Sequence, residues 1–212
     1  MWLHKVVEYT DKIRYNSELS KNEYPATQDG KSGNFERYTN DSGWLPDEHR
    51  WFQEAKKSKD NPYHDYYVWR DGKEGVYPND MRSVFGGPAW EWVPELEQYY
   101  FHQFSVKQPD LNWENEKVRQ EVYDMMKFWC EKGIDGFRMD VISMISKDQR
   151  FPDGEMNNGL YGDFGPYCVH GPRVHEFLQE MNQKVLSKYD IMTVGETAGV
   201  TIEEAQKYAG DD

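Results

Sequence analysis

The chain has 212 residues, enough for one ordinary domain and fewer than the roughly 250 that a complete (β/α)8 barrel usually takes. Aromatic residues make up 16% of it, and 25 basic residues stand against 38 acidic ones. The aromatic content argues against wholesale disorder. The net charge of −13 disfavours nucleic acid and anionic membrane surfaces as partners.

Two cysteines make neither a disulfide framework nor a zinc cluster, and they fit a reducing compartment. No apolar run approaches the length of a membrane span, and the first thirteen residues carry charges throughout. These features predict a cytoplasmic protein without a membrane segment or secretory signal. They leave its oligomeric state open.

The chain divides into three parts. Residues 1–46 are polar and weakly periodic, and their Asn, Ser, Asp, Gly and Lys content from 17 to 43 predicts loop or disorder. Residues 47–112 are dense in aromatic and turn residues. Within them, Lys56, Lys57 and Lys59 are expected to form a solvated helix face. Residues 113–212 alternate between helical and strand patterns.

The third part begins with a predicted helix that follows Asn112, a suitable N-cap, and ends at Gly133. Its apolar stripe comprises Val118, Val122, Met125, Trp129 and Cys130. A strand is expected over residues 136–142, followed by a loop over 146–171 that is rich in Gly, Asn, Asp and Pro.

A second helix is expected over 172–188, with an apolar stripe of Val174, Leu178, Met181 and Val185. The next strand, 191–195, is nearly all apolar, which predicts burial on both faces. Thr201 and Glu204 form a capping box that opens a third helix. Strands joined by helices pair in parallel, so this part is predicted to be α/β.

Each predicted strand leads to a carboxylate, Asp140 on the first and Glu196 after the second. Catalytic residues of parallel α/β folds gather at these strand ends. Two neighbouring carboxyl groups suit glycoside hydrolysis with retention of configuration. Their proximity raises the pKa of one of them, and Arg138 lies on the same strand face as Asp140. A single acid at a strand end is as often a loop cap or a solvated residue.

Two motifs carry a family resemblance. Residues 136–140 (GFRMD) resemble the nucleophile motif of glycoside hydrolase family 13, the α-amylase family, and residues 194–196 (VGE) resemble its acid/base motif. Residues 108–112 (QPDLN) resemble a motif of the oligo-1,6-glucosidase group, and segments at 47–52, 66–70 and 85–90 resemble that group's domain B. The resemblance runs from about residue 47 to residue 212.

The resemblance implies a partial (β/α)8 barrel around strands 4 and 5, in residues 113–212, with an inserted domain B in residues 47–112. Residues 1–46 are atypical for the family. Asp140 is then expected to be the nucleophile, Glu196 the general acid/base and Arg138 the support of the nucleophile. Val141 matches members that prefer α-1,6 linkages and would shape the +1 subsite, or it simply fills the strand. No metal or cofactor is expected.

The implied activity is that of a retaining α-glucosidase on short α-1,6-linked gluco-oligosaccharides of the isomaltose type. Trehalose-6-phosphate hydrolase, dextran glucosidase and sucrose isomerase remain alternatives, and Arg150 and Arg173 are the nearby candidates to recognise a phosphate. Trp90, Trp92, Tyr99, Tyr100 and Phe101 offer faces for sugar rings, although a core role is favoured for most of them.

The sequence also departs from the family pattern. The family's Asn-His motif is not found before Asp47, and its last motif, which carries a third carboxylate, would lie beyond Asp212. The chain is therefore expected to be a fragment that is inactive alone and prone to association, or a non-catalytic truncated product. His170 and His175 lack a third ligand at useful spacing, which argues against a zinc site.

Overall fold

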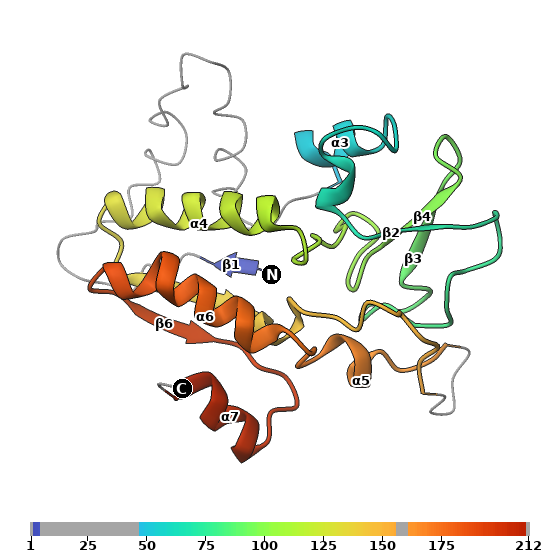
Figure 1. Ribbon diagram of the computed structural model, residues 1–212. Helices are drawn as coiled ribbons and strands as arrows, with labels where there is room; N and C mark the ends of the chain where they lie inside the picture. The colour runs from blue at the N-terminus through green and yellow to red at the C-terminus, as the bar shows by residue number, and fades with distance from the viewer. Residues whose placement is uncertain (1, 5–46, 156–160, 211–212) are drawn as a thin grey trace, which may run out of the picture.

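The computed structural model describes residues 2–4, 47–155 and 161–210. Two regions are seen in Figure 1: one in which α4 and α6 lie over a three-stranded sheet, and one built around a small antiparallel sheet. Most of the polar segment 1–46 lies outside the described residues, and so does the expectation of loop or disorder there.

The helices are α3 (Arg50–Ala55), α4 (Glu116–Glu131), α5 (Gly165–Cys168), α6 (Val174–Lys184) and α7 (Ile202–Ala209). Short 3-10 turns are η2 (His64–Tyr66), η3 (Ile142–Met144) and η4 (Leu186–Lys188). The strands are β1 (Trp2–His4), β2 (Trp69–Asp71), β3 (Trp90–Val93), β4 (Gln98–Phe101), β5 (Gly136–Asp140) and β6 (Met192–Gly195). None of the described helices is long and apolar enough to cross a membrane.

Helix α4 begins three residues later than predicted. Asn112 accepts a hydrogen bond from the Glu114 backbone, which closes a turn ahead of the helix. Asn115 is the residue that caps α4, because its side chain accepts from the Lys117 backbone N–H at 2.9 Å. Gly133 ends the helix as predicted, with a φ of +82° that suits glycine.

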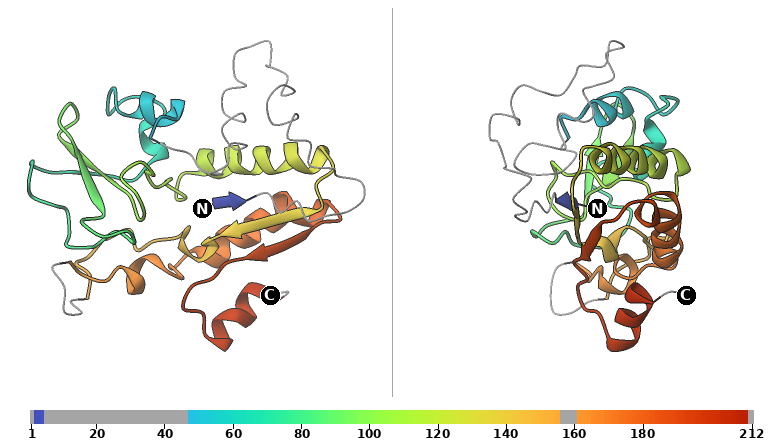
Figure 2. Two further views of the ribbon diagram at one scale, coloured as in Figure 1. Left: turned by 180° about the vertical axis from the view of Figure 1, so that it is seen from behind. Right: turned by 90° about the vertical axis from the view of Figure 1, so that its left-hand side faces the viewer.

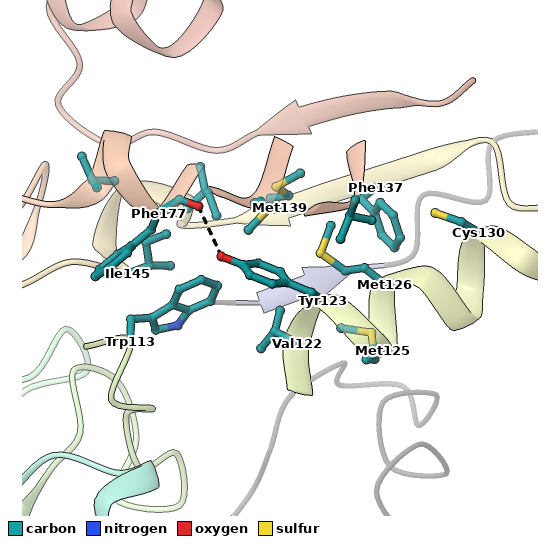
Figure 3. Close-up of a cluster of buried hydrophobic side chains, with 14 of the residues drawn as sticks. Trp113, Val122, Tyr123, Met125, Met126, Cys130, Phe137, Met139, Ile145 and Phe177 are labelled. Atoms are coloured by element: carbon teal, nitrogen blue, oxygen red, sulfur yellow. Dashed lines mark hydrogen bonds between the residues drawn. The ribbon is translucent and has the colours of Figure 1, made fainter. Parts of the chain in front are cut away.

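The apolar faces of α4 and α6 form the main core with β5 (Figure 3). Except for Val118, which is buried in the core of the second region, the predicted stripes are buried in this core or packed against it, and Phe177 of α6 is fully buried as well. Tyr123 of α4 lies among these side chains and donates its hydroxyl hydrogen toward the Phe177 carbonyl at 3.5 Å. Burial raises the pKa of Tyr123, which keeps that donor protonated.

Strands β5 and β6 pair in parallel, as predicted, with Gly136 opposite Met192 and Met139 opposite Gly195. Gly136 is required there, because a Cβ on it would lie 1.8 Å from the Met192 carbonyl oxygen. On its other side β5 pairs antiparallel with β1. Figure 2 shows β5 in the middle of this sheet.

The prediction of a strand buried on both faces is wrong for β6. All four of its residues are exposed, Met192 at 62% and Val194 at 49%. β6 lies at the edge of the sheet, and none of its residues belongs to the buried core. An apolar sequence permits burial, but burial itself depends on the neighbours that pack on the strand.

The connection between η3 and α6 is less irregular than predicted, because it contains α5. The helix expected over 172–188 is interrupted at Val185, whose φ and ψ of −134° and −67° leave the helical region. Its last part is the separate turn η4.

The second region contains the antiparallel sheet β2-β4-β3. Trp90, Tyr99, Tyr100 and Phe101 are buried in its cores, which confirms the core interpretation for them; Trp92 is half-buried and packs at the margin. The three lysines do not form a helix face, because α3 ends at Ala55. Lys56 caps that end, while Lys57 pairs with Glu54 and Lys59 with Asp71, at 2.6 and 2.7 Å.

Candidate active site

The two acids singled out by the sequence lie together at the carboxyl ends of the parallel strands β5 and β6. Asp140 is the last residue of β5, and Glu196 directly follows β6. The Glu196 backbone N–H donates to the Met139 carbonyl at 2.9 Å, which continues the parallel ladder to this point. The strand register therefore fixes the two carboxylates beside each other.

Arg138 joins the two acids. Its Nη1 donates to Asp140 Oδ1 at 2.5 Å, and its Nη2 donates to Glu196 Oε2 at 2.6 Å. A guanidinium presents its donors in a fixed fork, so one residue sets the spacing and orientation of both carboxylates. These contacts, above all the hydrogen bond to Asp140, raise the pKa of Arg138 and keep it charged.

The two acids differ in environment. The Asp140 side chain is 21% exposed and the Glu196 side chain 48%. A hydrogen bond with Asp140, followed by desolvation and by the Asp140 charge, raises the pKa of Glu196, while Arg138 opposes the rise. Of the two carboxyl groups, Glu196 is thus the better suited to carry a proton.

Val141 adopts a left-handed conformation, with φ of 42° and ψ of 40°. The interpretation of Val141 as strand filling is wrong, because β5 ends at Asp140 and η3 begins at Ile142. A β-branched residue in this region is strained, at a cost of about 1–3 kcal/mol. The strain lies at the residue that follows Asp140, and the backbone turns there.

The 108–112 segment contributes a contact that the sequence did not reveal. Asp110 accepts from the Gln103 backbone at 2.6 Å and pairs with Lys147 at 2.8 Å. Lys147 is buried, at 5% exposure of its side chain, and also donates to the Met144 carbonyl. A buried lysine needs such a partner, so this pair ties the antiparallel region to the segment after β5. Only the tertiary structure brings the two residues together.

The remaining candidates are placed elsewhere. His170 and His175 both contact Tyr208 of α7, and His175 lies 3.5 Å from Glu204. No group of three or more His, Cys, Asp or Glu side chains suited to a metal ion is found within residues 2–4, 47–155 and 161–210. Arg150 pairs with Asp148, and Arg173 pairs with Glu114 and Glu176.

A family model and several known enzymes are similar to this chain in sequence. The family model described as alpha amylase, catalytic domain, matches residues 42–212. The oligo-1,6-glucosidase of Parageobacillus thermoglucosidasius is 65% identical over 163 residues, which are 76% of this chain and 29% of that enzyme. The trehalose-6-phosphate hydrolase of Bacillus subtilis is 55% identical over 166 residues, 78% of this chain and 29% of that protein.

Solved structures of related enzymes also match this chain. The crystal structure of Bacillus licheniformis trehalose-6-phosphate hydrolase matches with a TM-score of 0.73 and 55% identity, over 78% of this chain and 29% of that one. An isomaltulose synthase mutant from Erwinia rhapontici in complex with sucrose matches with a TM-score of 0.70 and 47% identity, over 76% and 29%. The chain spans about three-tenths of the length of these relatives. With the family model matching most of its residues, the chain belongs to the alpha-amylase family and carries part of that family's catalytic domain.

Proposed function

We propose that this chain carries the nucleophile and the acid/base of a retaining α-glucosidase that acts on short α-1,6-linked gluco-oligosaccharides. The observation that carries the proposal is the fork of Arg138, which holds Asp140 and Glu196 together at the ends of two neighbouring parallel strands. The raised pKa of Glu196 supports its role as the acid.

The proposed reaction has two steps. In the first, Asp140 attacks the anomeric carbon and forms a β-glucosyl ester, while Glu196 turns from Asp140 to the glycosidic oxygen and donates its proton to it. In the second, Glu196 takes a proton from water, and that water breaks the ester with a second inversion. Arg138 orients Asp140 for the attack and keeps Glu196 within reach of the same sugar.

The preference for α-1,6 linkages rests on Val141 and on the oligo-1,6-glucosidases among the relatives. The left-handed backbone at Val141 lies beside the proposed nucleophile. The alternative of trehalose-6-phosphate hydrolysis has similar relatives. However, both arginines considered for phosphate are already paired with carboxylates, which favours the α-glucosidase.

We further propose that residues 47–112 serve as domain B, that the enzyme works in the cytoplasm, and that this chain by itself has little activity. Both cysteines are buried free thiols, and burial raises the pKa of Cys168 to about 12, so that it stays an unreactive thiol. The relatives are more than three times as long as the segment they share with this chain, which supports a larger complete site.

The test is a chimera in which residues 47–212 replace the matching segment of the Parageobacillus thermoglucosidasius oligo-1,6-glucosidase. We expect it to hydrolyse isomaltose with release of α-glucose, as followed by NMR. The unfused chain is expected to leave p-nitrophenyl α-glucoside almost untouched. Asp140→Asn in the chimera is the control for catalysis by this segment.

Substitution of Val141 tests the linkage. Val141→Ala in the chimera is expected to lower the ratio of kcat/KM for isomaltose to that for maltose by up to about tenfold, because it removes the side-chain contact that we propose shapes the +1 subsite. A chimera that prefers maltose or trehalose 6-phosphate to isomaltose would overturn the substrate class. A folded chimera without any glycosidase activity would overturn the enzyme proposal.

A further inference from the structure

One histidine links the segments that follow the two acids. The His170 backbone N–H donates to the Ser143 carbonyl at 2.8 Å, three residues beyond Asp140. Its ring Nε2 lies 3.0 Å from the carbonyl of Ala198, two residues beyond Glu196. His170 thus contacts both segments from a third one, the connection between α5 and α6.

The hydrogen bonds of the ring define its tautomer. A carbonyl oxygen only accepts, so Nε2 carries the hydrogen that it donates to Ala198. In the neutral imidazole, Nδ1 then accepts from the Tyr208 hydroxyl, 2.8 Å away. Burial raises the pKa of Tyr208 to about 12, so this hydroxyl keeps the proton that it donates. The imidazole is fixed at both ends.

The backbone around His170 is also constrained. His170 has a φ of 51°, in the left-handed region. At Gly171 a Cβ would lie 2.2 Å from the Ser146 carbonyl oxygen, and Arg173 N–H donates to the Ser146 hydroxyl. The 170–173 segment therefore lies directly against the segment after Asp140. His170 is thus strained in its backbone and held by its N–H and by both ring nitrogens.

The segment that carries Glu196 and Ala198 is largely exposed to solvent. Glu196, Ala198, Gly199 and Val200 are exposed, and β6 has β5 as its only neighbouring strand among the described residues. Tyr208 also contacts the ring of His175, which lies 3.5 Å from Glu204, and Glu204 pairs with Lys207.

We propose that His170 is a positioning residue that holds the Glu196 segment against the Asp140 segment through its Nε2–H bond to Ala198. This inference rests on the proposed function and deepens it, because it assigns how the acid on an exposed strand keeps its place beside the nucleophile. The contacts of His170 run to the backbone of Ser143 and of Ala198, so it acts through the backbone on which Glu196 is carried.

The test uses the full chain and needs no activity. Glutamate labelled with ¹³C at the side-chain carboxyl is titrated by NMR, and the Glu196 resonance is the one missing from Glu196→Gln. His170→Asn tolerates the left-handed backbone but is too short to reach Ala198. His170→Gln places an N–H about where Nε2 lies. Tyr208→Phe removes the donor that holds the ring.

We expect the Glu196 carboxyl of the parent chain to titrate above the ordinary glutamate range. In His170→Asn the upward shift should be lost, in His170→Gln largely kept, and in Tyr208→Phe reduced. An unchanged Glu196 titration in folded His170→Asn, or an equal loss in the Asn and Gln variants, overturns the inference. If His170→Asn does not fold, an unchanged titration in Tyr208→Phe overturns it instead.

The Glu196 titration of the unsubstituted chain distinguishes a failure of this inference from a failure of the proposed function on which it rests. An ordinary Glu196 titration in the parent would overturn the acid assignment itself, together with the inference. A raised pKa in the parent that is insensitive to position 170 would overturn the inference alone.

Discussion

Strands β5 and β6 are neighbours in one sheet, and the more apolar of the two, β6, is the more exposed. β5 buries Phe137 and Met139 in the main core between α4 and α6, while every residue of β6 is exposed. Asp140 thus stands on a rigid, packed strand and Glu196 on an edge strand. The proposed nucleophile is positioned by the core, whereas the proposed acid depends on polar contacts, namely the backbone bond to Met139, the Arg138 fork and the proposed His170 link.

The largest effects are expected from the two acids, and they should differ in kind. In the chimera, Asp140→Asn should lower kcat for isomaltose by at least about 10³-fold, because no other group replaces the nucleophile. Glu196→Gln should lower it by about 10²–10⁴-fold. The leaving group of α-glucosyl fluoride needs no proton. With this substrate, Glu196→Gln should therefore regain much of its lost rate in the first step, whereas Asp140→Asn should regain none. Equal recovery in both variants would contradict the assignment of roles.

Two methionines form a matched pair for the packing difference. Met139→Ala on β5 should lower the free energy of unfolding by about 2–5 kcal/mol, because its side chain is buried. Met192→Ala on β6 should change it by about 0.5 kcal/mol or less, since that side chain is exposed. Urea denaturation of the chain measures both. A large loss from Met192→Ala would show that β6 is covered in solution, for instance by a second copy.

The smallest effect is a pH dependence of stability. The pKa of Glu196 is raised in the folded chain, so the folded state binds this proton more tightly than the unfolded state. Its stabilising contribution is present below the ordinary glutamate pKa and is lost as the pH rises through the folded value. Glu196→Gln should therefore gain stability relative to the parent at pH 7, by about 1 kcal/mol or less for so exposed a group, and gain nothing at pH 4. Thermal melts at the two pH values check this.

Local patterns predicted much of the α/β half. The stripe of α4, the stop at Gly133, the cap of Thr201 on the Glu204 backbone, and the parallel pairing all follow from short-range chemistry and are present in the structure. The two acids lie together because the carboxyl ends of neighbouring parallel strands lie on the same side of a sheet. The start of α4 was misplaced because Asn112 and Asn115 are equally good caps by type, and only the observed turn separates them.

Long-range features were beyond the sequence. The exposure of β6 depends on what packs against it, and the pairing of Asp110 with Lys147 and the contact of His170 with Ala198 join residues far apart in the chain. The left-handed turn at Val141 also escaped prediction, because a β-branched residue is a poor sequence signal for that conformation. In each case the tertiary contacts prevailed over local preference.

The most direct test of the central claim is covalent trapping of the chimera. A 5-fluoro-α-glucosyl fluoride slows the second step, so the glucosyl ester accumulates and is found by peptide mass mapping. One label is expected, on Asp140, and none in Asp140→Asn. A label on Glu196 or on another carboxylate, or turnover of the reagent without any covalent label, would contradict it.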